Sequence, residues 1–157
     1  MASSVFEYLQ LKIPPLAVLV LFALVAYGLA YSLPYPWLEQ SIAIVLAILL
    51  LCTGVLVALA GVLAFNQAKT TVNPTQPAQA KQLVITGVYK FTRNPMYLGF
   101  LLVLMAVCCY LNSLLALLAC PLFVVYINVF QITPEEGVLR QKFSDFDDYC
   151  RQVRRWL

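Results

Sequence analysis

The sequence predicts an all-α integral membrane protein with four transmembrane helices, two of which form a helical hairpin, and a C-terminal cytoplasmic helical segment. Of its 157 residues, 62% are hydrophobic and 11% are charged, and the mean hydropathy is +0.85. So few polar groups cannot cover the surface of a soluble globule of this size. Long apolar runs alternate with short polar stretches, and the Lys and Arg residues gather in those stretches.

The first two apolar runs, 15–33 and 42–65, contain no charged residue. Each is close to the roughly 20 residues that cross a bilayer core, so each predicts a transmembrane helix. Between them, "PYPWLEQ" supplies prolines, which end helices, and Tyr35 and Trp37, which favour the headgroup level. The first run follows an amphipathic lead without a small-residue cleavage site, so we expect no removable signal peptide.

The third apolar run, 96–130, is too long for one span. A single helix rises about 1.5 Å per residue and would overshoot a bilayer core of about 30 Å. Its polar break is "YLNS" at 110–113. We therefore expect a hairpin with arms 95–110 and 113–130. Both arms are short, which implies local thinning of the bilayer or burial against the other helices.

The basic residues predict the orientation of the chain. The loop 66–94 carries four Lys or Arg residues and the segment 131–157 carries five, whereas the two opposite turns carry none. Both termini are therefore expected in the cytoplasm, in a bacterial inner membrane. The net charge of +3 is small, and no basic stripe interleaves with exposed aromatic residues. We expect membrane lipids, and not nucleic acid, as partners.

The polar segments carry further structural signals. In the loop 66–94 the first half is rich in prolines and amides, which predicts no regular structure, while the second half, "LVITGVYKF", favours order. No linker or internal repeat divides the chain, so one domain, 1–157, is expected.

The C-terminal segment predicts two short helices. Thr133, with a proline after it and Glu136 three residues on, has the pattern of a capping box. A second helix is predicted to start near Ser144, with Asp147 and Arg151 paired at i,i+4. This segment should lie on the membrane surface or fold back onto the hairpin.

The cysteines predict no redox or metal chemistry. None forms a CxxC pair and four lie in apolar runs, where a cysteine is usually a small hydrophobic residue. The chain has no histidine, so no zinc site is expected. The five are Cys52, Cys108, Cys109, Cys120 and Cys150.

Two stretches carry a joint motif. "GVYKFTRNPMYLG" at 87–99 precedes the hairpin, and "EEGVLRQKFSDFDDYCRQVRRW" follows it. Together, over roughly residues 70–157, they resemble the isoprenylcysteine carboxyl methyltransferase and phospholipid methyltransferase superfamily of integral membrane enzymes. That family has Arg-His-Pro-x-Tyr and then Glu-Glu. Asn94 replaces the commoner histidine, and Ser144 stands where glycine is frequent. The matching residues are Arg93, Pro95, Tyr97, Glu135 and Glu136.

The resemblance implies S-adenosylmethionine as methyl donor and S-adenosylhomocysteine as product. It places the donor between the cytoplasmic end of the hairpin and the C-terminal helices, with Arg93 and Glu136 in catalytic roles. The donor carries a carboxylate, an amino group, an adenine and a sulfonium, which require cations, carboxylates and aromatic walls. The glycine-rich G-x-G-x-x-G motif is absent. The donor-binding residues implied are Tyr89, Arg93, Asn94, Tyr97, Glu135 and Glu136.

The same residues could instead have purely structural roles. Arg93 could anchor a helix end in headgroups, the tyrosines could belong to an aromatic belt, and the glutamates could stabilise a first helical turn. The acceptor is expected to be lipophilic or amphiphilic: a prenylcysteine carboxylate, a lipid amine or a small hydrophobic thiol. A nicotinamide-dependent enzyme of the sterol-reductase kind and a non-catalytic membrane binding or scaffold protein are the alternative functions.

Overall fold

A computed structural model describes residues 10–70 and 77–157 of the chain, and these residues form helices and connecting segments without a β-strand. The all-α class is therefore confirmed. Most of the amphipathic lead and part of the loop 66–94 lie outside the described residues. The elements are α2 (Pro15–Ser32), α3 (Gln40–Gln67), η1 (Pro77–Gln79), η2 (Gly87–Lys90), α4 (Pro95–Leu111), η3 (Leu115–Leu118), α5 (Ala119–Ile127), η4 (Asn128–Ile132), α6 (Thr133–Lys142) and α7 (Phe146–Gln152).

Three helices are long and apolar enough to cross a membrane: α2, α3 and the continuous helix Leu115–Lys142. The fourth apolar helix, α4, is shorter, with 17 residues. The predicted limits of α2, α3 and α4 hold to within two residues. They hold because proline residues mark the starts of α2 and α4, and uncharged apolar runs fill all three helices.

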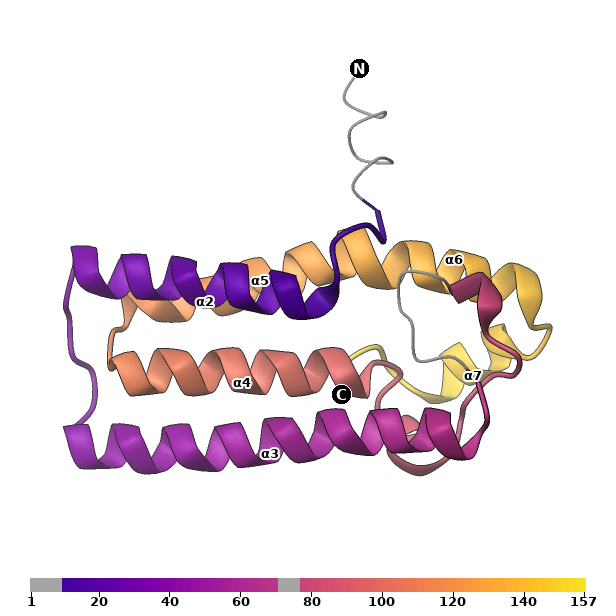
Figure 1. Cartoon of the computed structure of the whole chain (residues 1–157), viewed down its shortest axis with the longest axis horizontal. Helices are drawn as coiled ribbons and strands as arrows, with labels where there is room; N and C mark the ends of the chain where they lie inside the picture. Colours follow the sequence, from indigo (N-terminus) through magenta and orange to yellow (C-terminus); the bar gives the residue numbers. More distant parts are fainter. Residues whose placement is uncertain (1–9, 71–76) are drawn as a thin grey trace, which may run out of the picture.

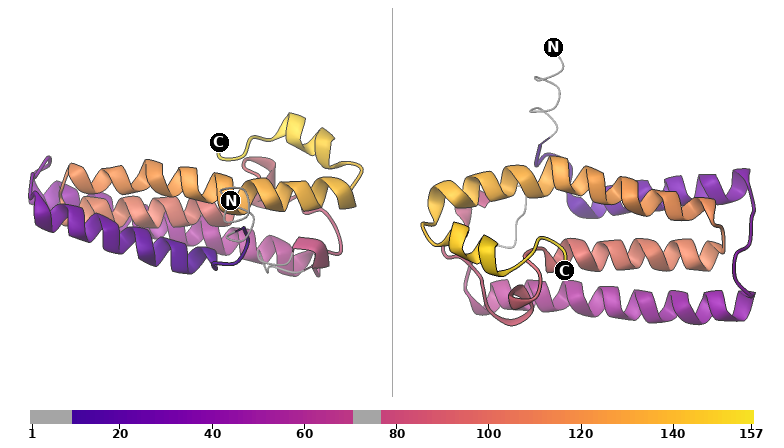
Figure 2. Two further views of the ribbon diagram at one scale, coloured as in Figure 1. Left: turned by 90° about the horizontal axis from the view of Figure 1, so that it is seen from above. Right: turned by 180° about the vertical axis from the view of Figure 1, so that it is seen from behind.

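The helices form a bundle with α4 at its centre (Figure 1). α3 packs along one side of α4, while α2 and α5 contact it from the other. The views in Figure 2 show both predicted cytoplasmic segments at one end of the bundle. The turns 33–39 and 112–114 lie at the opposite end. The C-terminus returns to the start of α4, so the tail folds back onto the hairpin, which is one of the two arrangements expected from the sequence.

The break in the hairpin is a left-handed turn at Asn112, which has φ 47° and is buried. Its Oδ1 accepts hydrogen bonds from the backbone N–H groups of Trp37 and Leu38, at 3.4 and 3.2 Å. Its Nδ2 donates to the Leu38 carbonyl at 2.9 Å and to Gln40 Oε1 at 3.2 Å. A single asparagine therefore fastens the hairpin to the turn between α2 and α3.

Glycine residues allow α3 and α4 to approach closely. A Cβ atom added at Gly99 would lie 2.6 Å from the Gly54 carbonyl oxygen and 2.7 Å from the Cβ of Ala58. Close approach through small residues is how helices associate in lipid, where the hydrophobic effect does not hold them together. This contact helps to fix the position of α4, whose first turn carries Pro95 and Tyr97 of the motif.

A Gly99→Ala substitution is expected to cost about 2 kcal/mol of stability in detergent, since backbone atoms of α3 would have to move to admit the methyl group. Thermal unfolding of the purified protein measures this. Gly28→Ala is the control, because a Cβ atom at Gly28 meets nothing within 4 Å. Equal unfolding temperatures for the two variants would contradict the close contact.

The last helix does not end near residue 130, where the last span was predicted to end. The helix continues from α5 through η4, a π-helical segment, into α6. Pro134 has no N–H to donate to the carbonyl of Phe130, four residues earlier. The Leu11 N–H donates to that carbonyl instead, at 3.0 Å. The proline is therefore accommodated within a helix and does not start one.

The predicted capping box at Thr133 is consequently wrong as well. The backbone is helical on both sides of this residue, and no side chain caps α6 at its start. Gln131, which is fully buried, steadies the π segment by donating from Nε2 to the carbonyl of Ile13 at 2.8 Å. Because Glu136 is not part of a capping box, its carboxylate is available for a different contact.

The second predicted helix of the tail exists as α7, which begins two residues after Ser144. The predicted ion pair between Asp147 and Arg151 does not form, however. Arg151 pairs with Asp148, and Asp147 accepts from Arg140 Nε on α6 at 2.7 Å. The guanidinium of Arg140 also lies over the ring of Phe146. Packing of α7 against α6 therefore decides the partner of Asp147.

Candidate active site

The motif residues meet where α4 begins, because the C-terminal segment (residues 153–157) runs back along residues 92–94. The Arg93 backbone N–H donates to the carbonyl of Arg154 at 3.0 Å. Thr92 Oγ1 and Asn94 Nδ2 both donate to the carbonyl of Arg155, at 3.1 and 3.0 Å. The side-chain amide of Asn94 thus joins the start of α4 to the C-terminal segment.

Three charged side chains, Arg93, Glu136 and Arg155, form an ion cluster. Arg93 Nη2 donates to Glu136 Oε1 at 2.8 Å. Arg155 Nε and Nη2 grip the same carboxylate, with Nη2 to Oε2 at 2.6 Å. The side chains of Arg93 and Glu136 are 11% and 9% exposed, whereas that of Arg155 is 37% exposed. The carboxylate of Glu136 is therefore held by two guanidinium groups.

Arg93 also fastens the end of α7. Its Nη1 donates to the carbonyls of Cys150 and Val153, at 3.0 and 2.6 Å. Its Nε is buried without a hydrogen-bond partner among the described residues. One guanidinium thus connects the start of α4 with α6 and α7, and the catalytic role implied for Arg93 and Glu136 stays a prediction.

A second contact involves the neighbouring glutamate. Tyr97, buried on the first turn of α4, donates from its hydroxyl to Glu135 Oε2 at 3.0 Å. Glu135 is half-buried, and its other oxygen has no hydrogen-bond partner in the part of the chain that the structure describes. Glu135 and Glu136 are adjacent on α6, but they bind different elements, and Glu135 keeps acceptor capacity for a ligand.

Tyr89 is buried and lies close enough to Glu135 to feel its charge. It lies on η2, whose first residue, Gly87, has φ +62°, and its ring meets that of Phe65 edge-on at 5.3 Å. Burial, and then the charge of Glu135 and the nearby Tyr149, raise the pKa of the Tyr89 hydroxyl. It therefore stays protonated at neutral pH.

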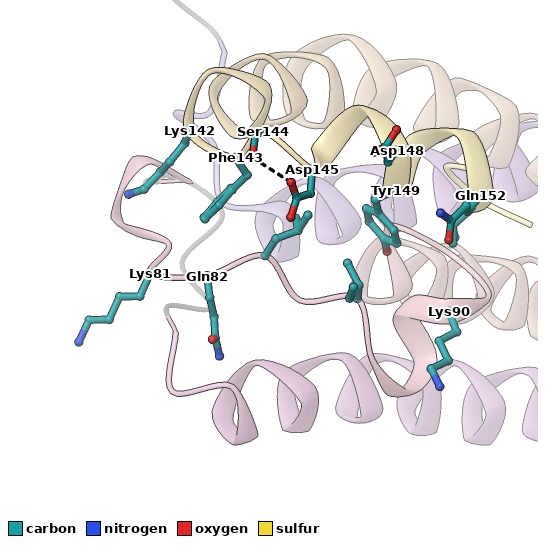
Figure 3. A pocket seen from close by; sticks show the side chains of 13 residues that line it. Lys81, Gln82, Lys90, Lys142, Phe143, Ser144, Asp145, Asp148, Tyr149 and Gln152 are labelled. Atoms are coloured by element: carbon teal, nitrogen blue, oxygen red, sulfur yellow. Dashed lines mark hydrogen bonds between the residues drawn. The ribbon is translucent and has the colours of Figure 1, made fainter.

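An open cleft of about 930 Å³ lies between α7 and the segment before η2 (Figure 3). Two of its wall residues also contact the motif region. Tyr149 donates from its hydroxyl to the carbonyl of Tyr89 at 2.7 Å, and Val153 accepts from Arg93. Burial raises the pKa of the Tyr149 hydroxyl, and Arg93 opposes that rise. The cleft is lined by Lys81, Gln82, Leu83, Ile85, Lys90, Lys142, Phe143, Ser144, Asp145, Asp148, Tyr149, Gln152 and Val153.

The sequence model of the phospholipid methyltransferase family matches residues 42–145, which is more than half of the chain. The chain belongs to the phospholipid methyltransferase family. The resemblance drawn from the motifs is therefore confirmed. The family match starts at residue 42 and so includes α3, which the motif resemblance had left out.

The family assignment identifies the protein as a member of a membrane methyltransferase family. An uncharacterized protein of Haemophilus influenzae is 46% identical to it over 63 residues, which are 40% of this chain and the whole of that protein. No solved structure matches the chain significantly.

The structure also shows site residues that sequence reasoning missed. Arg155 appeared only as one more cation of a basic tail, yet it completes the ion cluster. Trp156, next to it, donates from Nε1 to Asn128 Oδ1 on the π segment at 3.2 Å. Neither has a spacing that could have been recognised, because their partners lie 19 and 28 residues away.

The amide of Asn94 can be tested by two substitutions. Asn94→His should keep the fold and ligand binding, because an imidazole N–H can also donate to the Arg155 carbonyl. Asn94→Asp should lower the unfolding temperature, since a carboxylate would face that carbonyl without a proton to donate. Unfolding of the two variants by circular dichroism gives the comparison. The reverse order of stability would refute the role of this hydrogen bond.

Proposed function

We propose that residues 1–157 act as one domain that transfers a methyl group from S-adenosylmethionine to a lipophilic or amphiphilic acceptor. S-adenosylhomocysteine would leave as product. The observation that carries this is the meeting of Tyr97 and Glu135 at the start of α4, beside an ion cluster, in a chain of a methyltransferase family. Residues far apart in sequence converge there.

The residues present fit the donor. The unpartnered oxygen of Glu135 suits the donor's amino group, and Tyr97 orients that carboxylate. Tyr89 supplies an aromatic wall. Arg93, Asn94 and Glu136 hold the C-terminal segment against the start of α4. Their contribution to catalysis would then be the positioning of the residues that contact the donor.

When bound, the donor supplies an electrophilic methyl carbon on a sulfonium. A lone pair of the acceptor forms the new bond to that carbon while the carbon–sulfur bond breaks. The electron pair of the broken bond stays on sulfur and neutralises the sulfonium. Positioning and exclusion of water supply most of the acceleration in such a displacement. A base is needed only for a protonated acceptor, so the absence of histidine from the sequence is compatible with this reaction.

The acceptor is proposed to approach from the bilayer. The site lies at the end of a bundle whose helices present exposed apolar side chains along their length, among them Leu56, Leu59 and Leu63 of α3. The family match supports a phospholipid amine as the first acceptor to test. A prenylcysteine carboxylate and a small hydrophobic thiol are the other candidates.

Titration calorimetry in detergent tests the proposal. The protein should bind S-adenosylmethionine and not a reduced nicotinamide. Glu135→Gln should weaken binding about 10- to 100-fold, because the hydrogen bond to a charged group is lost. Glu39→Gln, in the turn at the opposite end of the bundle, is the control. Binding of nicotinamide, or of neither ligand, would sink the proposal in favour of the reductase or scaffold alternatives.

We also propose that both termini face the cytoplasm of a bacterial cell. The grouping of the basic segments at one end of the bundle supports this. In intact cells, a membrane-impermeant maleimide should label a cysteine at Tyr35 and leave one at Lys81 unlabelled, in a background without native cysteines. The opposite pattern would place the site on the wrong side for a cytosolic donor.

A further inference from the structure

We infer that Arg155 binds the carboxylate of the methyl donor. The inference rests on the proposed function and adds to it the residue that recognises the amino-acid end of the donor. It assigns a ligand contact to the C-terminal segment, which lies outside the part of the chain that the family match covers.

Arg93, the cation that the motif suggests, has no free edge for a carboxylate. Nη1 is engaged by two carbonyls and Nη2 by Glu136. Nε is buried, and the whole side chain is only 11% exposed. A carboxylate could reach this guanidinium only if the end of α7 moved away.

Arg155 has such an edge. A guanidinium offers two forks for carboxylates, one made by Nε with one terminal nitrogen and one made by the two terminal nitrogens. Glu136 occupies the first fork, through Nε and Nη2. Nη1 has no hydrogen bond to any described residue, and the side chain is 37% exposed. The second fork is therefore open.

The surroundings orient that fork. The backbone carbonyl of Arg155 is fixed by Thr92 and Asn94, and its guanidinium by Glu136. The residue before Glu136 is Glu135, the proposed partner of the donor's amino group. One turn of α6 would then supply a carboxylate for the ammonium and, through Glu136, a positioned cation for the carboxylate. A zwitterion is recognised by such a pair of opposite charges.

Decarboxylated S-adenosylmethionine separates this role from a structural one, because it keeps the amine and the sulfonium and lacks the carboxylate. By calorimetry, the wild-type protein should prefer S-adenosylmethionine to this analogue by about 10- to 100-fold. Arg155→Ala should abolish that preference, because it should weaken binding of S-adenosylmethionine about 10- to 100-fold more than binding of the analogue. Arg155→Lys should keep part of it, because lysine has the charge without the fork.

Arg154→Ala is the matched control, since this neighbouring side chain is exposed and only its backbone carbonyl is bonded. It should retain the full preference. Equal weakening of both ligands in Arg155→Ala, or an undiminished preference, overturns the assignment while the proposed function stands. A wild-type protein that binds neither ligand overturns both. The preference is a ratio within each variant, so moderate loss of stability does not affect it.

Discussion

Glu136→Gln is expected to lower the free energy of unfolding by about 3–5 kcal/mol, because it leaves a buried arginine without its counter-charge. Glu136 and Arg93 are both largely buried, and the carboxylate is the shared acceptor of two guanidinium groups. A glutamine of the same shape keeps one acceptor oxygen but places an amide N–H₂ against a cation. Titration with a denaturing detergent in mixed micelles measures the loss.

Asp147→Asn is the control for this prediction. It breaks an ion pair with Arg140 whose two side chains are more than half exposed, and such pairs contribute little. No measurable change is expected. If Glu136→Gln were as stable as Asp147→Asn, the ion cluster would not be the element that holds α6 to the start of α4.

Arg93→Lys is expected to cost about 3 kcal/mol of stability, although the charge is kept. The ammonium of lysine can stay near Glu136, but it cannot also reach the carbonyls of Cys150 and Val153 as the planar guanidinium does. Two hydrogen bonds from a charged group are lost, at about 1.5 kcal/mol or more each. The same mixed-micelle titration applies.

The end of α7 provides a specific readout for Arg93→Lys. In this variant the carbonyls of Cys150 and Val153 lose their guanidinium donor. Exchange of the backbone amide hydrogens should therefore increase over residues 150–157 more than in the membrane helices. Arg140→Lys, which changes an arginine in an exposed pair, should leave this exchange unchanged. Unaltered exchange in Arg93→Lys would show that the C-terminal segment is held by other contacts.

The membrane helices could be predicted because their causes are local. Uncharged runs of the right length fill α2 and α3, and prolines mark the first residues of α2 and α4. The hairpin followed from length alone, since 96–130 is too long for one crossing. Asn112 was visible as a polar break, but its four hydrogen bonds to the turn 37–40 depend on tertiary structure.

The continuous helix at 115–142 could not be predicted for a physical reason. Thr133, Pro134 and Glu136 have the same spacing whether a proline starts a helix or lies inside one. A helix that continues through the proline needs another donor for the carbonyl of Phe130, to which Pro134 cannot donate. That donor is the N–H of Leu11, more than a hundred residues away in sequence.

At the candidate site, the motif identified residues but not their partners. Arg93, Asn94, Tyr97, Glu135 and Glu136 do come together. Glutamates at the start of a helix favoured a capping role, and only the helix running through residue 133 rules that role out. Arg155 carried no motif, because the contact that makes it part of the cluster is set by the path of the chain after α7.

The π segment Asn128–Ile132 sets the direction in which α6 points its side chains. Each residue of an α-helix turns the chain by about 100° around the axis. A π turn holds one residue more than an α turn. If these five residues formed an α turn with no residue removed, every later side chain of the helix would rotate by about that angle. Glu135 would then leave Tyr97 and Glu136 would leave Arg93, while the apolar part of the helix before the π segment would keep its place in the bundle. Insertion into the membrane and assembly of the site are thus separable at a single turn, within one unbroken helix.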